Sequence, residues 1–122
     1  MEINGLEKKE GFPKKYRLTG DKEISEIVRN GRTVGAKYFC LKYLPAEHKK
    51  IAVRVGRKVG RPVVRNKIRR WVREIFRKNK EKFPDAHIVV LVNENAICAT
   101  FWDFHEEFLK ALQKIKNEMA KV

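Results

Sequence analysis

The chain has 122 residues, of which 43% are hydrophobic, a size and composition that suit one domain with a packed core. Its 29 Lys and Arg outweigh 15 Asp and Glu, and the resulting net charge of +14 at pH 7 favours a polyanionic partner. Because no stretch approaches the about 20 apolar residues of a membrane span, and residues 1–15 lack the apolar segment of a signal peptide, we expect a cytoplasmic protein.

The N-terminal part of the chain predicts an arm, a short helix and a strand. Residues 1–15 combine glycines, a proline and scattered lysines, so we expect a flexible basic arm ahead of a single domain over residues 16–122. The pattern over residues 21–30 predicts a helix that ends at Gly31. Partial alternation of apolar residues then predicts one strand over residues 33–44.

The remaining elements follow from the same kind of pattern. Strict alternation over residues 51–55 predicts a second strand with basic residues on one face, and a Gly-rich basic loop follows at 56–62. A helix comes next and is broken at residues 83–86, before an apolar run at 87–92 that predicts a strand buried on both faces. From Thr100 onward, apolar residues follow helical spacing. This order predicts an α+β fold, a compact sandwich of helices packed on a small sheet.

The most informative segment is residues 54–80, which holds twelve Lys or Arg and one acid, Glu74, and so carries +11 of the net charge. Turning its residues by about 100° each predicts a helix, starting near Pro62, with an apolar face and a basic face. The apolar face comprises Val64, Ile68, Trp71, Val72 and Ile75. The opposite half comprises Asn66, Arg69, Arg70, Arg73 and Arg77, with Arg65 at the boundary. One side can pack on a sheet while the other presents a row of guanidinium groups.

The chemistry of this basic face suits a nucleic acid. The planar guanidinium of arginine binds phosphate oxygens with two hydrogen bonds, and Asn66 can add hydrogen bonds to phosphate, ribose or a base edge. Gly56 and Gly60 are expected to let the preceding backbone approach a phosphate closely. A merely solvated face would mix charges of both signs, and a membrane would compete for the apolar side that a small domain needs for its core. We therefore predict a nucleic-acid partner.

Other candidate sites are weaker. The three histidines and two cysteines show no metal-ligand spacing, and no cluster of acids supports a self-sufficient nuclease. Cys40 and Cys98 lie in apolar runs, so we expect buried free thiols. Trp71 and Trp102 each adjoin a helical apolar stripe, so we expect both in the core.

The segment from Val55 to Arg77 resembles the signature of the protein component of bacterial ribonuclease P. The first part of that signature is two basic residues, a hydrophobic residue and Gly. After a few intervening residues, the second part is Arg-Asn-Arg or Arg-Asn-Lys, a hydrophobic residue and two further basic residues. Residues 57–60 and 65–70 meet every position of it. The resemblance extends over about residues 16–115, beginning with Tyr16-Arg17-Leu18.

The resemblance implies a subunit that binds a large catalytic RNA and assists its Mg²⁺-dependent cleavage of precursor tRNA, which forms the mature 5′ end. It implies one protein per RNA, with the chemistry carried by the RNA, and hence no catalytic residue, no metal site and no tightly held cofactor in the protein. It also implies an α–β sandwich with a left-handed βαβ crossover around the basic helix, against the usual rule. The implied RNA-binding residues are Arg57, Lys58, Arg61, Arg65, Asn66, Lys67, Arg69, Arg70 and Arg73.

The family also holds the single-stranded 5′ leader of precursor tRNA in a cleft beside the sheet. Two cleft positions that are commonly Phe in the family are here Ile24 and Val28, which cannot stack on bases. Tyr38 and Phe39 are the remaining aromatic candidates, expected on opposite faces of one strand, although Phe39 fits an ordinary core position equally well. The further candidates are the cations Lys37, Lys42 and Arg54.

Two alternatives stay open from the residues. A general RNA- or DNA-binding module, such as a ribosomal or RNA-chaperone protein, could use the same basic helix on a duplex backbone. Acids such as Asp21 or Glu23 could hold a weakly bound Mg²⁺ ion.

Overall fold

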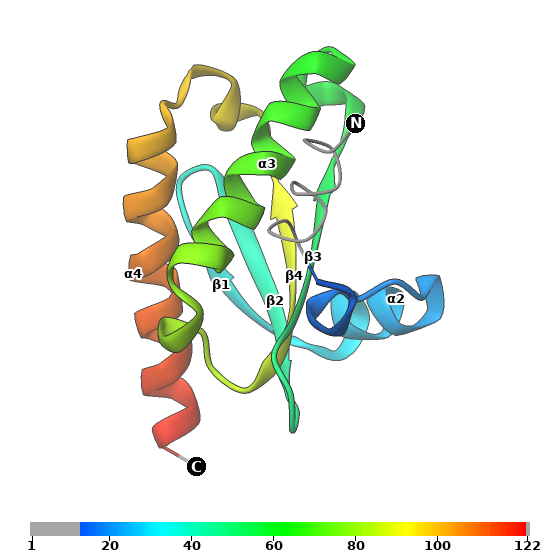
Figure 1. Cartoon of the computed structure of the whole chain (residues 1–122), viewed down its shortest axis with the longest axis vertical. Helices are drawn as coiled ribbons and strands as arrows, with labels where there is room; N and C mark the ends of the chain where they lie inside the picture. The colour runs from blue at the N-terminus through cyan, green and yellow to red at the C-terminus, as the bar shows by residue number, and fades with distance from the viewer. Residues whose placement is uncertain (1–12, 122) are drawn as a thin grey trace, which may run out of the picture.

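The computed structural model describes residues 13–121 as a four-stranded sheet with helices on both faces (Figure 1). The strands are β1 (Arg32–Gly35), β2 (Phe39–Pro45), β3 (Lys50–Val55) and β4 (Ala86–Val92), in the order β1-β2-β4-β3. Strand β2 pairs antiparallel with β1 and with β4, whereas β3 and β4 pair parallel. The predicted α+β sandwich with a small mixed sheet is therefore confirmed.

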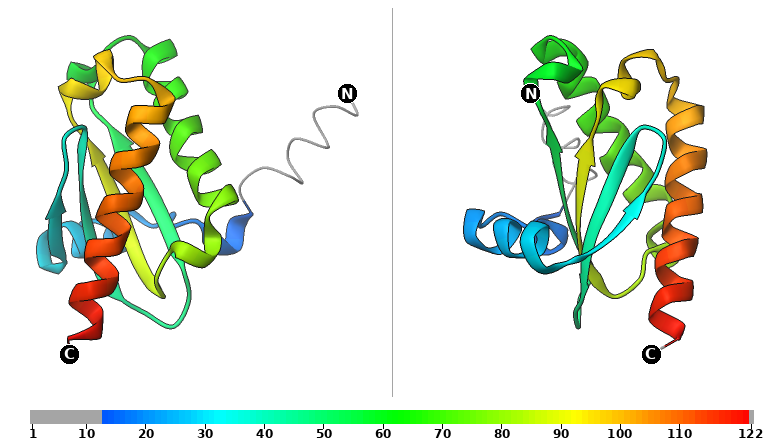
Figure 2. Two further views of the ribbon diagram at one scale, coloured as in Figure 1. Left: turned by 90° about the vertical axis from the view of Figure 1, so that its left-hand side faces the viewer. Right: turned by 180° about the vertical axis from the view of Figure 1, so that it is seen from behind.

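The helices are divided unequally between the two faces. Helices α3 (Pro62–Lys78) and α4 (Phe101–Ala120) cover one face, and the shorter α2 (Asp21–Asn30) lies on the other (Figure 2). Because α2 is half the length of α4, it leaves part of its face uncovered. We call the face that carries α2 the open face of the sheet.

Alternation along β2 shows how the sequence produces these layers, because successive side chains of a strand point to opposite faces. Phe39, Leu41 and Tyr43 are buried toward α3 and α4, where Phe39 packs on two rings of α4 and the Tyr43 hydroxyl donates to the carboxylate of Glu118. The intervening Cys40, Lys42 and Leu44 are half-buried on the open face. A second, small cluster on that face consists of Leu18, Ile24, Ile27 and Val89.

The connection from β3 through α3 to β4 is left-handed. In Figure 1 both strands point upward, α3 lies in front of the sheet, and the chain passes from β3 on the right to β4 on its left. This handedness was implied by the family resemblance and departs from the right-handed rule for βαβ units. It sets α3 against β3, which is an edge strand, so that a flank of the helix borders the free edge of the sheet.

The single strand predicted over residues 33–44 is wrong, because the chain turns back at residues 36–38 to form the β1–β2 hairpin. The buried residue of β1 is the even-numbered Val34, whereas those of β2 are odd-numbered. One continuous strand could not bury both parities on one face, since its side chains alternate with a period of two.

Two glycines are required by the backbone for different reasons. At Gly31, after α2, a Cβ atom would clash with the carbonyl oxygen of Ile27, so only glycine fits this close approach. Gly60 has φ of 143°, a conformation that side chains disfavour, and it redirects the chain into α3. Pro62 occupies the first turn of α3, as predicted.

Helix α4 begins with a capping box. The Thr100 hydroxyl accepts the amide of Asp103 at 3.1 Å, and the Asp103 carboxylate accepts the amide of Thr100 at 3.4 Å. The predicted apolar stripe packs in the core, but Trp102 is 69% exposed, so its predicted burial is wrong. It follows Phe101 by one residue and therefore lies about 100° around the helix from the stripe.

The cysteines differ from expectation, and the N-terminal segment is described only from residue 13 onward. Both thiols are free, but Cys98 is exposed on a short 3-10 helix before α4, and Cys40 is half-buried. The expected arm over residues 1–15 lies outside the described residues up to residue 12, and its end enters the 3-10 helix Lys14–Tyr16. The ring of Tyr16, the first residue of the predicted domain, lies 5.0 Å from that of Phe76. No helix within residues 13–121 has the length and apolar character needed to cross a membrane.

Candidate nucleic-acid interface

Helix α3 has the two faces that its sequence predicts. Ile68, Val72 and Ile75 are buried against the sheet and α4, and Trp71 is half-buried, with its ring 5.6 Å from that of Phe104. Phe76, which the helical projection left outside the apolar face, is also buried, between the rings of Tyr16 and Phe83. The polar side of the helix is exposed or half-exposed along its whole length.

The positive charge on this helix is largely uncompensated. The one acid, Glu74, lies 2.6 Å from Arg77 and 3.4 Å from Lys78, and the hydrogen bond from Arg77 is the main cause of its lowered pKa. Among residues 13–121, the other cations of α3 form no ion pair with a carboxylate. These cations are Arg65, Lys67, Arg69, Arg70 and Arg73. These side chains are therefore available to bind an external anion.

Three contacts position individual side chains on this face. The guanidinium of Arg69 donates to the Asn66 side-chain oxygen at 2.8 Å, and the Lys67 ammonium lies 5.3 Å from the centre of the Trp71 ring. The Nε of Arg65 is buried without an acceptor in the described part of the chain. A buried donor left without a partner costs about 1–3 kcal/mol.

The loop before α3 adds three cations at the N-terminal end of the helix. Arg57 and Lys58 are exposed on the 3-10 helix Arg57–Val59, whose Val59 is buried and anchors the loop. Arg61 is exposed as the residue that caps α3. Gly60 has the unusual backbone predicted for this loop, whereas Gly56 has an ordinary φ of −73°.

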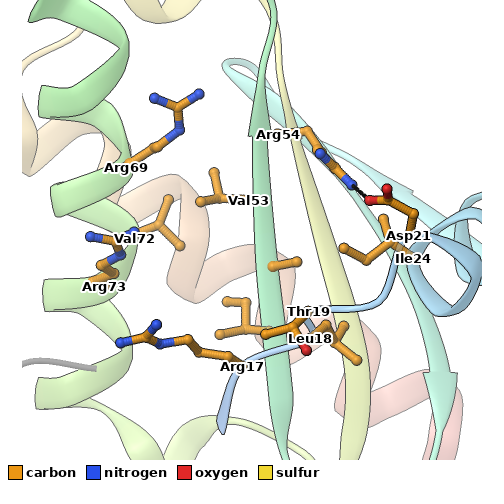
Figure 3. A pocket seen from close by; sticks show the side chains of 12 residues that line it. Arg17, Leu18, Thr19, Asp21, Ile24, Val53, Arg54, Arg69, Val72 and Arg73 are labelled. Carbon is orange, nitrogen blue, oxygen red and sulfur yellow. Dashed lines mark hydrogen bonds and ion pairs between the residues drawn. The ribbon is translucent and has the colours of Figure 1, made fainter. Parts of the chain in front are cut away.

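A cavity of about 270 Å³ lies beside the outer edge of β3, and we call it the edge cavity. Arg69 and Arg73 approach it from α3, Arg17 approaches it from the segment before α2, and Val53 of β3 lies between them (Figure 3). Partial burial, followed by the charges of Arg17 and Arg69, lowers the pKa of Arg73. No local pattern indicates that Arg17 joins this group, because a non-local contact between its segment and β3 places it there.

The open face of the sheet holds a second, shallower groove. It is lined by Ile24, Ser25, Val28, Arg29 and Arg54. Arg54 lies 3.4 Å from Asp21, and the Lys42 ammonium, on the same face of the sheet, donates to the Thr33 hydroxyl at 2.6 Å. Val28 is half-buried, while Ile24 is 7% exposed and belongs mainly to the small core. The structure thus brings together Val28, Lys42 and Arg54 at this face.

The other leader-cleft candidates lie elsewhere. Phe39 is 1% exposed, with its ring 4.9 Å from that of Phe104, and Tyr38 is 8% exposed and stacks on the same ring. Both pack under α4, so the expectation that they occupy opposite faces of one strand is wrong. Lys37 lies in the β1–β2 turn, where its amide donates to Glu107.

The described residues contain no group of three or more His, Cys, Asp or Glu side chains that could hold a metal ion. Asp21 pairs with Arg54, and Glu23 lies 3.9 Å from His87, so the two acids that could bind a weak Mg²⁺ ion face cations or a histidine instead.

The sequence and the fold of this chain are similar to those of one protein family. A family model described as Ribonuclease P matches residues 12–116. The ribonuclease P protein component of Thermotoga petrophila is 30% identical over 115 residues, which cover 88% of this chain and 98% of that protein. The solved RNase P protein of Thermotoga maritima has a TM-score of 0.74 at 30% identity, covering 80% of this chain and 96% of that one.

The solved RNase P protein of Staphylococcus aureus has a TM-score of 0.78 at 25% identity, covering 83% of this chain and 95% of that one. The match of the family model spans nearly all of the described fold, including the basic helix and both strands that flank it. The chain therefore belongs to the family of ribonuclease P protein components, and its role lies in the ribonuclease P holoenzyme that processes tRNA.

Proposed function

We propose that this chain binds the catalytic RNA of ribonuclease P through the basic face of α3 and the loop before it. The observation that carries the proposal is the row of cations on α3 that have no carboxylate partner in the described part of the chain. Repulsion within such a row disfavours folding, and phosphates along an RNA backbone would relieve it while releasing condensed counterions. Arginine fits this role because its fork of N–H groups matches phosphate oxygens.

The open face of the sheet is the proposed site for the single-stranded 5′ leader of precursor tRNA. Val28 offers an apolar surface, and Lys42 and Arg54 lie on the same face, so bases could rest on apolar side chains while phosphates meet the cations. Without aromatic residues in the groove, leader binding would rest on van der Waals contact and charge. A leader so held would favour precursor over mature tRNA.

The chemistry is assigned to the RNA and its Mg²⁺ ions, and the protein is proposed to act in the cytoplasm as one copy per RNA. Near the groove, Asp21 pairs with Arg54 and Glu23 lies 3.9 Å from His87, so the two acids are not arranged as a shared pair of metal ligands. The protein residues would bind and orient the two RNAs, and charge from α3 would lower the Mg²⁺ concentration needed to hold them together.

Reconstitution tests this function. The purified protein would be mixed with transcribed ribonuclease P RNA at a Mg²⁺ concentration at which the RNA alone is inactive, and cleavage of a precursor tRNA followed. Cleavage at the mature 5′ end, with neither component active alone, is expected. Binding of the RNA without any cleavage would contradict the proposal and leave a general RNA-binding module.

A further inference from the structure

The free edge of β3 points into the edge cavity. The carbonyl of Ile51 accepts the amide of Leu18 at 3.1 Å, on the side of β3 away from β4. Residues two apart on a strand direct their backbone N–H and C=O groups to the same side, so those of Val53 also point away from β4. Within residues 13–121 no strand pairs with β3 beyond Ile51 on that side, and Val53 lines the cavity.

Four arginines line the same cavity. Arg54 is paired with Asp21, and the other three come from two distant segments. Arg69 and Arg73 come from α3, and Arg17 comes from the segment that pairs with β3 (Figure 3). The mutual effect of these charges on the pKa of Arg73 agrees with their closeness. The cavity therefore combines cations with an unpaired backbone donor and acceptor, and its volume of about 270 Å³ is near the lower end for small-ligand pockets.

We propose that the edge cavity binds one nucleotide of single-stranded RNA, with its phosphates on Arg17, Arg69 and Arg73 and its base hydrogen-bonded to the backbone of Val53. Duplex RNA has its base edges occupied by pairing, so it cannot offer them to the strand edge. An extended acidic peptide could also pair with this strand edge through its own backbone and meet the arginines, so a peptide is the competing occupant that the experiment must exclude. The RNA partners of the proposed function favour a nucleotide. The inference rests on the proposed function and deepens it, because the edge cavity adjoins the groove beside α2 and shares Ile24 and Arg54 with it.

The edge cavity lies between the basic face of α3 and the groove beside α2. At this junction it would distinguish single-stranded from paired RNA. Arg69 and Arg73 belong to the basic face of α3, whereas Arg54, the residue of β3 after Val53, lines both the cavity and the groove. One strand of RNA could pass from the groove around the edge of β3 to α3. Arg17 is therefore assigned as an RNA-positioning residue that the basic helix does not include.

Titration of the isotope-labelled full chain by NMR tests this site. The probes are a four-nucleotide single-stranded RNA, the same chain with abasic sugars, inorganic phosphate, and a Glu-rich peptide of equal charge. The Val53 amide is expected to shift with the RNA and not with the other three probes. Equal affinity for the RNA and the abasic chain, or for the RNA and the peptide, would overturn the proposal.

Variants test separately the arginines that bind phosphate and the Val53 backbone that binds the base. Arg17→Ala is expected to weaken RNA binding about tenfold, the loss of one charged hydrogen-bonded contact, while Lys110→Ala on α4 leaves it unchanged. Val53→Pro removes the backbone donor at an edge position where proline is tolerated, and Val53→Ala keeps it. Only the proline variant should lose the preference for RNA over the abasic chain.

No effect of Arg17→Ala would overturn the phosphate half of the site. Because the abasic comparison is made in the unaltered chain, a Val53→Pro variant that failed to fold would not remove the test. If the proposed function itself were wrong, a different experiment would show it: the unaltered protein, reconstituted with ribonuclease P RNA, would produce no cleavage.

Discussion

The guanidinium of Arg69 donates a 2.8 Å hydrogen bond to the side-chain oxygen of Asn66, one helical turn before it. Asn66 thus fixes the side chain that joins the basic face of α3 to the edge cavity. A carboxylate at this position would hold Arg69 as an ion pair and lower the positive charge available to a phosphate.

Asn66→Asp is accordingly expected to weaken binding of ribonuclease P RNA more than Asn66→Ala, although the aspartate is closer in shape. The added negative charge opposes phosphate, whereas alanine only removes a hydrogen bond worth about 0.5–1.5 kcal/mol. Filter binding at two salt concentrations measures both effects. Equal losses for the two variants would show that charge at residue 66 is unimportant.

Gly60→Ala is expected to destabilise the fold by about 1–3 kcal/mol, because the backbone at φ of 143° is strained for any residue with a side chain. Gly56→Ala is the matched control, since its φ is −73° and a Cβ there meets no atom within 4 Å. That change should be neutral or stabilise by up to about 1 kcal/mol. Urea unfolding of both variants checks the pair, and an unaltered midpoint for Gly60→Ala would refute the backbone argument.

The pH dependence of stability should involve His87. Burial is the main cause of its lowered pKa, with Lys50 and His48 adding to the effect and Glu23 opposing it. The folded protein therefore binds this proton less readily than the unfolded chain. The free energy of unfolding is at its full value above the ordinary pKa of 6.5 and falls as the pH drops toward the lower folded pKa.

His87→Gln should flatten this dependence between about pH 7.5 and 5, since glutamine does not titrate. His48→Gln, at an exposed histidine in the β2–β3 turn, should leave most of it in place. Denaturant unfolding at several pH values provides the measurement. The prediction fails if His87→Gln loses stability on acidification as steeply as the unaltered protein does.

Val28→Phe should increase leader discrimination. An aromatic ring at this groove position could stack on a base, a contact worth about 1–3 kcal/mol. The preference of the holoenzyme for precursor over mature tRNA should therefore rise by about 5- to 150-fold. Val28→Leu enlarges the side chain without an aromatic face and is the control. A similar gain for leucine would attribute the effect to apolar area rather than to stacking.

The amphipathic helix and the order of elements followed from the sequence because they depend on local periodicity. Ile68, Val72 and Ile75 lie on one face of any helix of this sequence. The exposure of Trp102 could have been predicted in the same way, since it lies outside the stripe of α4. The change in the parity of buried residues between Val34 and Phe39 likewise indicates the hairpin that was missed.

Other features depend on contacts between distant segments and have no local signal. Tyr38 and Phe39 pack beneath Phe104 only because α4 returns across that face of the sheet. Arg17 reaches the edge cavity because its neighbour Leu18 bonds to Ile51. The handedness of the β3–α3–β4 crossover came from the family resemblance, since periodicity carries no information about it.

The salt dependence of RNA binding tests the central claim, that the uncompensated cations of α3 bind the RNA backbone, most directly. The affinity of the protein for ribonuclease P RNA would be measured across a range of salt concentrations for the unaltered chain and for a triple variant with Arg65, Arg69 and Arg73 changed to Ala. A second triple variant, with Lys110, Lys114 and Lys121 changed to Ala, removes the same charge from α4 and from the residue that follows it. The magnitude of the slope of log affinity against log salt should fall by about 2–3 for the arginine variant and stay nearly constant for the lysine variant. Equal slopes for the arginine variant and the unaltered protein would contradict the assignment of α3 as the RNA-binding surface.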